Sequence, residues 1–219
     1  MGFPRVFVLS LPSSPRRAII THELNSAGIP FEFVDGVEVG SDRATFLRMW
    51  MADHFPDTPG DYATSRLSHG TLGTLLAFMR LFKRIAEDGD VDTPTLVLED
   101  DNVVNRAFDF RHIDWRELHS SSGAPMFTFL SKSSKKYGLW AQLVSREGAQ
   151  FVIDHVRDVL HTNIAIDFFV WLHPDMTRCN LYTTSGAWLF EQLAPENHPG
   201  HSERLRINLR HTGKADDVS

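Results

Sequence analysis

Cysteine is nearly absent from this sequence, with Cys179 the single example among 219 residues. An internal disulfide is therefore excluded, and a reducing compartment is the expected environment. Long hydrophobic runs are lacking too, because no stretch approaches the ~20 apolar residues that a membrane helix needs. The apolar run at Met1–Leu11 is short and ends at Pro12 without a small-residue cleavage site, so it predicts a strand rather than a signal peptide. We expect a cytoplasmic protein without a transmembrane segment; a peripheral contact at the inner face of the membrane stays open.

Positive charge is not in excess, because 22 Lys and Arg face 28 Asp and Glu, for a formal net charge of −6. This balance argues against a nucleic-acid-binding protein. The sequence also lacks the G-x-G-x-x-G and P-loop signatures, the G-x-S-x-G nucleophile elbow and the H-E-x-x-H zinc pair. The sequence therefore lacks the motifs that would indicate a Rossmann enzyme, a kinase, a triad hydrolase or a zinc protease.

Bulky apolar residues, in contrast, are plentiful. Hydrophobic residues make up 42% of the chain and include 16 Phe and 5 Trp, enough for a sizeable core without disulfides. Neither an internal repeat nor a linker interrupts the pattern. We therefore predict one domain over residues 1–191 and a partly irregular C-terminal tail over residues 192–219, where Pro, His, Gly, Arg and Asp dominate.

The N-terminal region has the pattern of a strand–helix–strand unit. Arg5–Leu11 is rich in apolar and β-branched residues, which is typical of a buried strand. Ser14 and Pro15 then predict a helix start, with serine as the N-cap and proline in the first turn, and Gly28 predicts the helix end. Phe31–Val34 is a second candidate strand. Such a unit indicates a parallel sheet.

The remaining elements continue the alternation of helices and strands. Ser68 and Ser145 each predict the cap of an amphipathic helix, and Ser41–Phe55 predicts a further helix. An exposed flexible loop is expected at Ser131–Gly138. The predicted strands are Thr95–Leu98, Met126–Leu130 and Leu139–Val144, with weaker candidates at Ile164–Val170 and Asn180–Thr184. The predicted fold class is α/β, with a mostly parallel central sheet flanked by helices.

The strongest chemical feature is a run of three carboxylates directly after the predicted strand Thr95–Leu98. In an extended chain Glu99 and Asp101 would point to one side and Asp100 to the other. Adjacent carboxylates repel one another, and a divalent cation with oxygen ligands relieves the repulsion. The carboxyl edge of a parallel sheet is also where open α/β folds bind ligands. The alternative is a solvated acidic turn that caps the next helix.

Two basic segments could bind an anionic substrate. Arg16 and Arg17 open the first predicted helix, where free N–H groups, the helix dipole and two guanidinium forks suit phosphate. The alternative is an ordinary capped helix with exposed arginines. The loop at Ser131–Lys136 carries three lysines and could clamp an anion or simply be solvated.

Histidine and a late aspartate offer further candidates. None of the 11 histidines stands in a metal-pair spacing. His69 follows the predicted cap Ser68, where it could bind a ligand or serve packing and capping. Asp167 and His173 share one weakly patterned segment, and either could complete a metal site or an acid–base pair.

These segments together resemble glycosyltransferase family 25, which includes lipooligosaccharide and collagen galactosyltransferases. The resemblance spans residues 6 to about 170 and is carried by four blocks: Val6–Arg17 (VFVLSLPSSPRR), Gly28–Gly36 (GIPFEFVDG), Leu67-Ser68-His69 with Leu96–Asp101 (LVLEDD), and Val144–Gly148 (VSREG) with Ile166-Asp167. The combination of the SH and LEDD motifs at this separation is the most specific part of the resemblance.

The resemblance implies a single GT-A type, nucleotide-sugar-binding domain. It makes Glu99, Asp100 and Asp101 a DxD-like motif for Mn²⁺ (or Mg²⁺) and the donor diphosphate, with Asp101 and Glu99 as the metal ligands. Asp167 is the candidate general base of an inverting reaction. The residues expected at the donor site are Arg16, Arg17, Asp35, Ser68, His69, Glu99 and Asp100.

The predicted function is metal-dependent, inverting transfer of a hexose from a UDP-sugar to an acceptor hydroxyl. Galactose is the favoured sugar, and lipooligosaccharide or other glycan biosynthesis is one setting in which such a transfer could occur. The expected partners are the nucleotide-sugar donor and a glycan, lipid-linked glycan or protein acceptor, without nucleic acid. Two alternatives stay open: a non-catalytic sugar-nucleotide or partner-binding family member, and a metal-dependent nucleotidyltransferase or phosphohydrolase that uses the same carboxylates.

Overall fold

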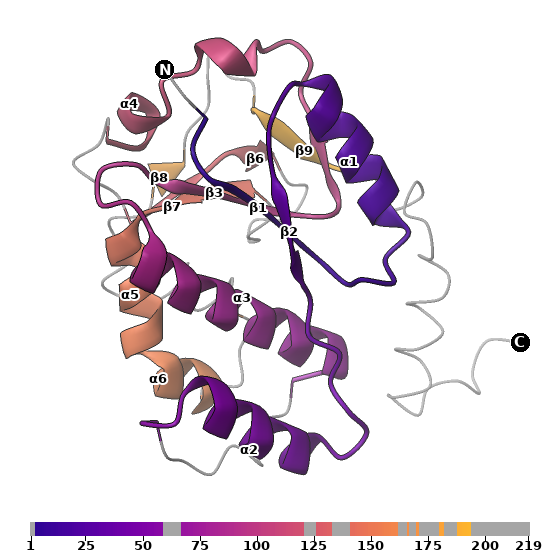
Figure 1. The fold of residues 1–219 in the computed structure, drawn as a ribbon, viewed down its shortest axis with the longest axis vertical. Coiled ribbons are helices and arrows are strands. Elements are labelled where there is room, and N and C mark those ends of the chain that lie inside the picture. Colours follow the sequence, from indigo (N-terminus) through magenta and orange to yellow (C-terminus); the bar gives the residue numbers. More distant parts are fainter. Residues whose placement is uncertain are drawn as a thin grey trace, which may run out of the picture.

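The computed structural model describes residues 3–58, 67–120, 126–132, 141–161, 166, 170, 180–181 and 188–193. Helices and strands are interspersed along this length (Figure 1). In chain order they are β1 (Val6–Ser10), α1 (Arg16–Ser26), β2 (Glu32–Asp35), α2 (Arg43–His54), α3 (His69–Asp88), β3 (Thr95–Glu99), β4 (Asn102–Val104), the 3₁₀ turn η1 (Phe110–His112), α4 (Trp115–Ser120), β5 (Phe127–Phe129), β6 (Ser131–Lys132), β7 (Ala141–Val144), α5 (Arg146–Asp154), α6 (Val156–His161), β8 (Asn180–Leu181) and β9 (Phe190–Gln192).

The described strands form a six-stranded central sheet in the order β2-β1-β3-β7-β5-β8. β1 pairs in parallel with both β2 and β3, and β5 pairs in parallel with β8. β7 lies between β3 and β5 and runs antiparallel to both. The prediction of a mostly parallel sheet is therefore confirmed, with β7 as the reversed strand. A small second sheet has the order β4-β9-β6.

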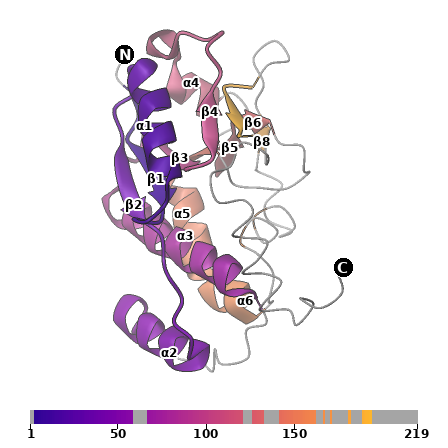
Figure 2. The same ribbon diagram turned by 90° about the vertical axis from the view of Figure 1, so that its right-hand side faces the viewer.

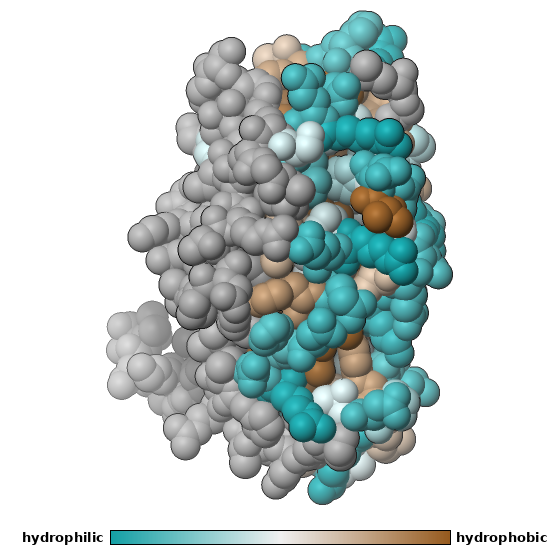
Figure 3. All heavy atoms as spheres, turned by 90° about the vertical axis from the view of Figure 1, so that its left-hand side faces the viewer, coloured by the Kyte–Doolittle hydropathy of each residue, from teal (hydrophilic) through white to brown (hydrophobic). Residues whose placement is uncertain are grey.

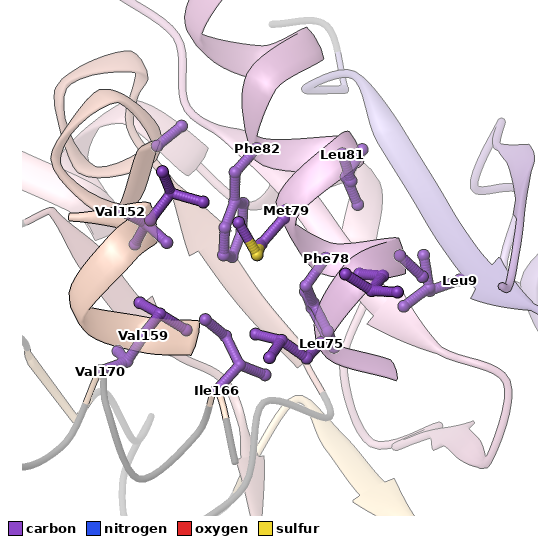
Figure 4. Close-up of a cluster of buried hydrophobic side chains, with 14 of the residues drawn as sticks. Leu9, Leu75, Phe78, Met79, Leu81, Phe82, Val152, Val159, Ile166 and Val170 are labelled. Carbon is purple, nitrogen blue, oxygen red and sulfur yellow. The ribbon is translucent and has the colours of Figure 1, made fainter. Parts of the chain in front are cut away.

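Helices cover both faces of the central sheet (Figures 1 and 2). Alternate residues of β1 point to opposite faces, so Phe7 lies in the core under α3 and α5, whereas Val8 lies in the core under α1. The core on the α3 side is the larger. Figure 4 shows side chains of α3, among them Phe78, Met79 and Phe82, packed against Val152 and others on the α5–α6 side.

Two predicted helix caps are confirmed. The Ser68 hydroxyl accepts a hydrogen bond from the N–H of Thr71 over 3.1 Å and begins α3, and the Ser145 hydroxyl accepts one from Gly148 over 2.9 Å and begins α5. Gly28, at φ +69°, ends α1 as predicted, since a left-handed residue closes a helix most easily when it has no Cβ. Local capping chemistry therefore sets several of the element boundaries.

Three local predictions are wrong. Ser14 is not the N-cap of α1: Pro15 holds that position and the helix begins at Arg16, while the Ser14 hydroxyl accepts from the Arg16 N–H over 3.3 Å and donates to the carboxylate of Asp100. The helix that begins after Ser145 is two helices, α5 and α6, which meet at His155 without a proline or glycine to mark the break.

The segment predicted as the strand Ile164–Val170 is helical at Ile166 and Val170, the two residues of it that the structure describes. Both side chains are buried in the core under α3, and a short apolar run cannot distinguish a buried strand from a buried helix. Two further boundaries can be placed. Ser131 and Lys132 form β6, while residues 133–138 of the expected loop lie outside the described residues, and Gln192 belongs to β9.

Gly73 allows α3 to approach the segment that follows β2. A Cβ at this position would overlap the backbone oxygen of Val37, whereas a Cβ at Gly70, one turn earlier, would meet nothing within 4 Å. We expect Gly73→Ala to lower the free energy of unfolding by about 1–3 kcal/mol, because backbone must shift to accommodate the methyl group. Gly70→Ala should be neutral or stabilising by up to about 1 kcal/mol, as alanine favours helix. Urea unfolding of both variants tests this contrast, and equal effects would contradict it.

His119 makes the stability of the fold depend on pH. Its side chain is buried, its Nδ1 lies 3.0 Å from the hydroxyl of Thr128, and desolvation lowers its pKa to about 4. The unfolded state has the higher pKa and binds more protons, so stability is present above pH 6.5 and is lost as the pH falls toward 4. We expect this group to destabilise the wild type by about 2 kcal/mol at pH 5 relative to pH 7.5.

Denaturant unfolding at the two pH values tests the role of His119. His119→Gln should remove most of the pH dependence, because it retains a polar partner for Thr128 without a titrating ring. His112→Gln, at a side chain that is 82% exposed, should keep the wild-type dependence. A His119→Gln variant with the wild-type slope would show that other groups cause the pH effect.

Among the described residues, the exposed large hydrophobic side chains are Met49 and Val91. On the face in Figure 3, hydrophilic side chains predominate and hydrophobic ones form small separate patches. Within the described ranges, no helix combines the length and apolar composition needed to cross a bilayer.

Candidate functional site

Polar side chains gather where β1, β2 and β3 end. The register places Ser10 of β1 opposite Asp35 of β2, and Leu9 of β1 opposite Glu99 of β3. The parallel pairing therefore brings residues that are far apart in sequence to one edge of the sheet. The loop before α1 leaves β1 at the same edge (Figure 1). This is the edge at which the carboxylate run was expected to bind a ligand.

Asp100 is buried and surrounded by donors. Its Oδ2 accepts hydrogen bonds from the hydroxyls of Ser10 and Ser14, each over 2.7 Å. Its Oδ1 forms an ion pair with the Nη2 of Arg16 at 2.8 Å, and the two side chains are only 5% and 11% exposed. Asp100 therefore joins the end of β3 to the end of β1 and to the first residue of α1.

Asp101 is equally buried but less completely satisfied. Its Oδ2 accepts a hydrogen bond from Nε2 of Gln192 over 3.1 Å and lies 3.9 Å from Nη1 of Arg16. The backbone oxygen of Asp101 accepts from the N–H of Leu193 over 2.7 Å. In contrast, Oδ1 of Asp101 is buried and has no hydrogen-bond partner in the described part of the chain. An orphaned carboxylate oxygen is costly unless a ligand or cation satisfies it.

The expected alternation of the three carboxylates is wrong because the strand ends at the first of them. β3 stops at Glu99, and Asp100 and Asp101 form a turn that the side-chain amide of Asn102 stabilises by donating to the Glu99 backbone oxygen over 2.9 Å. Both aspartates consequently face Arg16. The alternative of a solvated acidic turn is also wrong for Asp100 and Asp101, since both are buried.

Only two of the three carboxylates, Glu99 and Asp101, are placed so that they could bind a cation. Both oxygens of Asp100 are engaged by Ser10, Ser14 and Arg16, so this residue is compensated within the protein. Asp101 offers the unpartnered Oδ1, and Glu99 is the adjacent half-buried carboxylate. No group of three His, Cys, Asp or Glu side chains that could hold a metal ion is found among the described residues. A cation bound here would take its remaining ligands from a substrate.

A second group of charges lies beside this site at the end of β2. Nη2 of Arg17 donates to the Asp35 carboxylate over 2.5 Å and to the Ser10 backbone oxygen over 2.9 Å, and its guanidinium lies 4.5 Å from the ring centre of Phe33. Arg80 of α3 donates to the backbone oxygen of Asp35. Arg17 and Asp35 were both expected near a nucleotide, and the structure brings them together. The carboxylate of Asp35 is 61% exposed.

Residues 3–112 match the model of glycosyltransferase family 25, described as an LPS biosynthesis protein family. The matched segment is half of the chain and includes β1, β2, β3 and all three carboxylates. The chain belongs to glycosyltransferase family 25. Among solved structures it is similar to a glycosyltransferase involved in the glycosylation of the major capsid of PBCV-1, with 10% identity, a TM-score of 0.43 and coverage of 93% of this chain and 100% of that chain. No curated protein matches the sequence.

Family membership makes this protein a glycosyltransferase, which implies a sugar donor and a glycan acceptor. The predicted family is thereby confirmed, and so is the α/β class expected of a GT-A-like domain, with its helix-flanked sheet. In this family 25 chain, Arg16 is buried against Asp100, so the alternative of two merely exposed arginines is wrong for this residue.

The other predicted site residues of this glycosyltransferase have different placements. Ser68 and His69 lie at the start of α3, where the Ser68 hydroxyl serves the helix cap and also lies 2.8 Å from the hydroxyl of Thr71. The close approach at Gly73 puts this end of α3 beside the segment that follows β2. Asp167, with His173 and the lysines after Lys132, lies outside the described residues.

Two residues of the site were missed from the sequence. Ser10 was assigned only to a strand, although a serine at the carboxyl end of an apolar run signals a polar edge. Gln192 was assigned to the tail, and its three-residue strand carries no periodic signal. Its contact with Asp101 joins residues 91 positions apart, which no local pattern predicts.

Proposed function

We propose that this family 25 enzyme transfers a hexose, with galactose favoured, from a UDP-sugar to an acceptor hydroxyl with the help of Mn²⁺ or Mg²⁺. The observation that carries the proposal is the buried, unpartnered Oδ1 of Asp101 at the carboxyl edge of the sheet. The description of the matched family names LPS biosynthesis, which favours a lipooligosaccharide or another glycan as the acceptor. A cytoplasmic site of action is part of the same proposal.

Asp101 and Glu99 are the residues that would hold the cation. Small divalent ions are commonly bound by one or two carboxylates together with substrate phosphates, which fits the partial ligand set of this edge. A bound cation supplies neutralisation of the charge that develops on the leaving diphosphate. Arg16 holds Asp100 in place and lies 3.9 Å from Asp101, so it fixes the geometry of the carboxylate pair.

The nucleotide is proposed to bind over the ends of β1 and β2. The exposed carboxylate of Asp35 is an acceptor for hydroxyl groups of the ribose, and Arg17 orients that carboxylate through their 2.5 Å hydrogen bond. Ser68 and His69 at the start of α3 complete the proposed donor side. Carboxylates at strand ends recognise ribose hydroxyls in other nucleotide-binding α/β folds for the same chemical reason.

The acceptor hydroxyl must lose a proton as it attacks the anomeric carbon. Asp167 is the proposed general base for a single displacement, which inverts the configuration at that carbon. The new glycosidic bond forms as the bond to the nucleoside diphosphate breaks, and the proton passes to the carboxylate.

Product analysis with a panel of nucleotide sugars and glycan acceptors tests the proposal. Transfer releases one nucleoside diphosphate for each glycoside formed, in a reaction that EDTA stops and Mn²⁺ restores. Release of pyrophosphate would instead show a nucleotidyltransferase, and release of inorganic phosphate a phosphohydrolase. Donor binding without any glycoside would show a non-catalytic family member.

A further inference from the structure

Strand β9, in the last described segment of the chain, contacts Asp101, the carboxylate on which the proposed donor site depends. Gln192 donates from Nε2 to Oδ2 of Asp101 over 3.1 Å, and the N–H of Leu193 donates to the Asp101 backbone oxygen over 2.7 Å. Two adjacent residues therefore hold both the backbone and one carboxylate oxygen of Asp101. The other oxygen, Oδ1, is buried and without a hydrogen-bond partner among the described residues.

Contacts that do not involve Asp101 anchor β9 to the domain. The strand pairs antiparallel with β4 and parallel with β6. Phe190 is fully buried, its ring centre lies 5.4 Å from that of Phe110, and its N–H donates to the Leu130 backbone oxygen over 3.1 Å. Gln192 is thus presented to Asp101 from a fixed support, which is what precise orientation of a functional carboxylate requires.

The amide of Gln192 suits this task because it donates a hydrogen bond without adding charge. A lysine or arginine in its place would add a second positive charge beside Asp101, after that of Arg16, and would repel a cation, whereas a glutamate would repel Asp101. Oδ2 faces the amide and, at 3.9 Å, Nη1 of Arg16, which leaves the lone pairs of Oδ1 for an incoming group. Outer partners of this kind typically affect metal affinity or activity by 10- to 100-fold.

We propose that Gln192 is a positioning residue that holds Oδ2 of Asp101 so that Oδ1 is directed to the cation and diphosphate of the donor. This inference rests on the proposed function, because it assumes that Asp101 binds the cation. It also couples β9 to the donor site, since the stabilisation of one by the other must be reciprocal. Binding of cation and nucleotide should therefore slow hydrogen exchange at the Leu193 amide.

Titration with Mn²⁺ in the presence of UDP, followed by calorimetry, tests the role of Gln192. We expect Gln192→Ala and Gln192→Leu to raise the Mn²⁺ concentration for half-maximal UDP binding by about 10- to 100-fold. Leucine keeps most of the side-chain volume, so it provides the test if the alanine variant is poorly folded. The matched control is Glu191→Gln, at an exposed residue of the same strand, which should keep the wild-type requirement. Thermal unfolding in EDTA reports whether each variant is folded.

The outcomes separate this inference from the proposed function. An unchanged Mn²⁺ requirement in a folded Gln192 variant overturns the positioning role and leaves the donor site standing. A wild type that binds UDP with Mn²⁺ but shows no slower exchange at Leu193 overturns the coupling to β9. A wild type with no Mn²⁺-dependent UDP binding overturns both the donor site and the role of Gln192.

Discussion

Asp101→Asn is expected to lower the rate of sugar transfer at least 100-fold, because it removes the charge that would bind the cation while keeping the size of the side chain. Losses of about 10²–10³ are typical when one group that stabilises developing charge is removed. Asparagine can still accept the hydrogen bond from Gln192, so the surrounding contacts are retained. The loss should appear in kcat/KM for the nucleotide-sugar donor, whichever fixed concentration of acceptor is used. The rate is measured by release of the nucleoside diphosphate.

Two comparisons identify the cause of that loss. Asp53→Asn, at a carboxylate that is 80% exposed on α2, should retain wild-type transfer. The free energy of unfolding of Asp101→Asn in EDTA should be close to that of the wild type or above it, since the change removes a buried charge. Full metal-dependent transfer by Asp101→Asn would show that the cation binds elsewhere.

Arg16→Met is expected to cost about 3–5 kcal/mol of the free energy of unfolding, the largest effect on stability that we predict. The substitution leaves Asp100 buried without its cationic partner, and an uncompensated buried charge is strongly unfavourable. Equilibrium unfolding in denaturant measures the loss. The hydroxyls of Ser10 and Ser14 remain as hydrogen-bond donors to Asp100, but they do not neutralise it.

The adjacent arginine provides the matched control. Arg17→Met removes the same group one residue later, where the partner Asp35 is 61% exposed, so we expect a loss of only about 1 kcal/mol. The double variant Arg16→Met with Asp100→Asn should recover a large part of the stability lost by Arg16→Met, because the buried charge is then absent. Equal losses for Arg16→Met and Arg17→Met would contradict the account of the buried pair.

Where local chemistry decides the structure, the sequence was a good guide. Apolar, β-branched runs predicted β1 and β3, the hydroxyls of Ser68 and Ser145 predicted the starts of α3 and α5, and Gly28 predicted the end of α1. The carboxylate run directly follows a strand of a parallel sheet, so it was expected at the carboxyl edge of that sheet. The sequence alone therefore predicts where the carboxylate run lies in the fold.

Features set by contacts distant in sequence could not be predicted in the same way. Asp100 and Asp101 lie in a turn, so both face Arg16. The alternation expected of a strand predicts instead that they point to opposite sides. Arg16 itself was expected to face a phosphate, and only the packing of α1 against the sheet reveals its ion pair with Asp100. The contribution of Gln192 depends on a three-residue strand that pairs with residues about ninety positions earlier, so it leaves no local signal.

The most direct test of the account is the thermal unfolding midpoint of the wild type and Asp101→Asn, with UDP-galactose and with other nucleotide sugars, in Mn²⁺ and in EDTA. A donor at a hundredfold excess over its Kd stabilises the folded state by about 2.7 kcal/mol, which raises the midpoint of a domain of this size by roughly 5–10 °C. We predict such a shift for the wild type in Mn²⁺ with one donor, and its loss in EDTA and in Asp101→Asn. A shift of equal size in EDTA or in Asp101→Asn would contradict a cation-dependent donor site at Asp101.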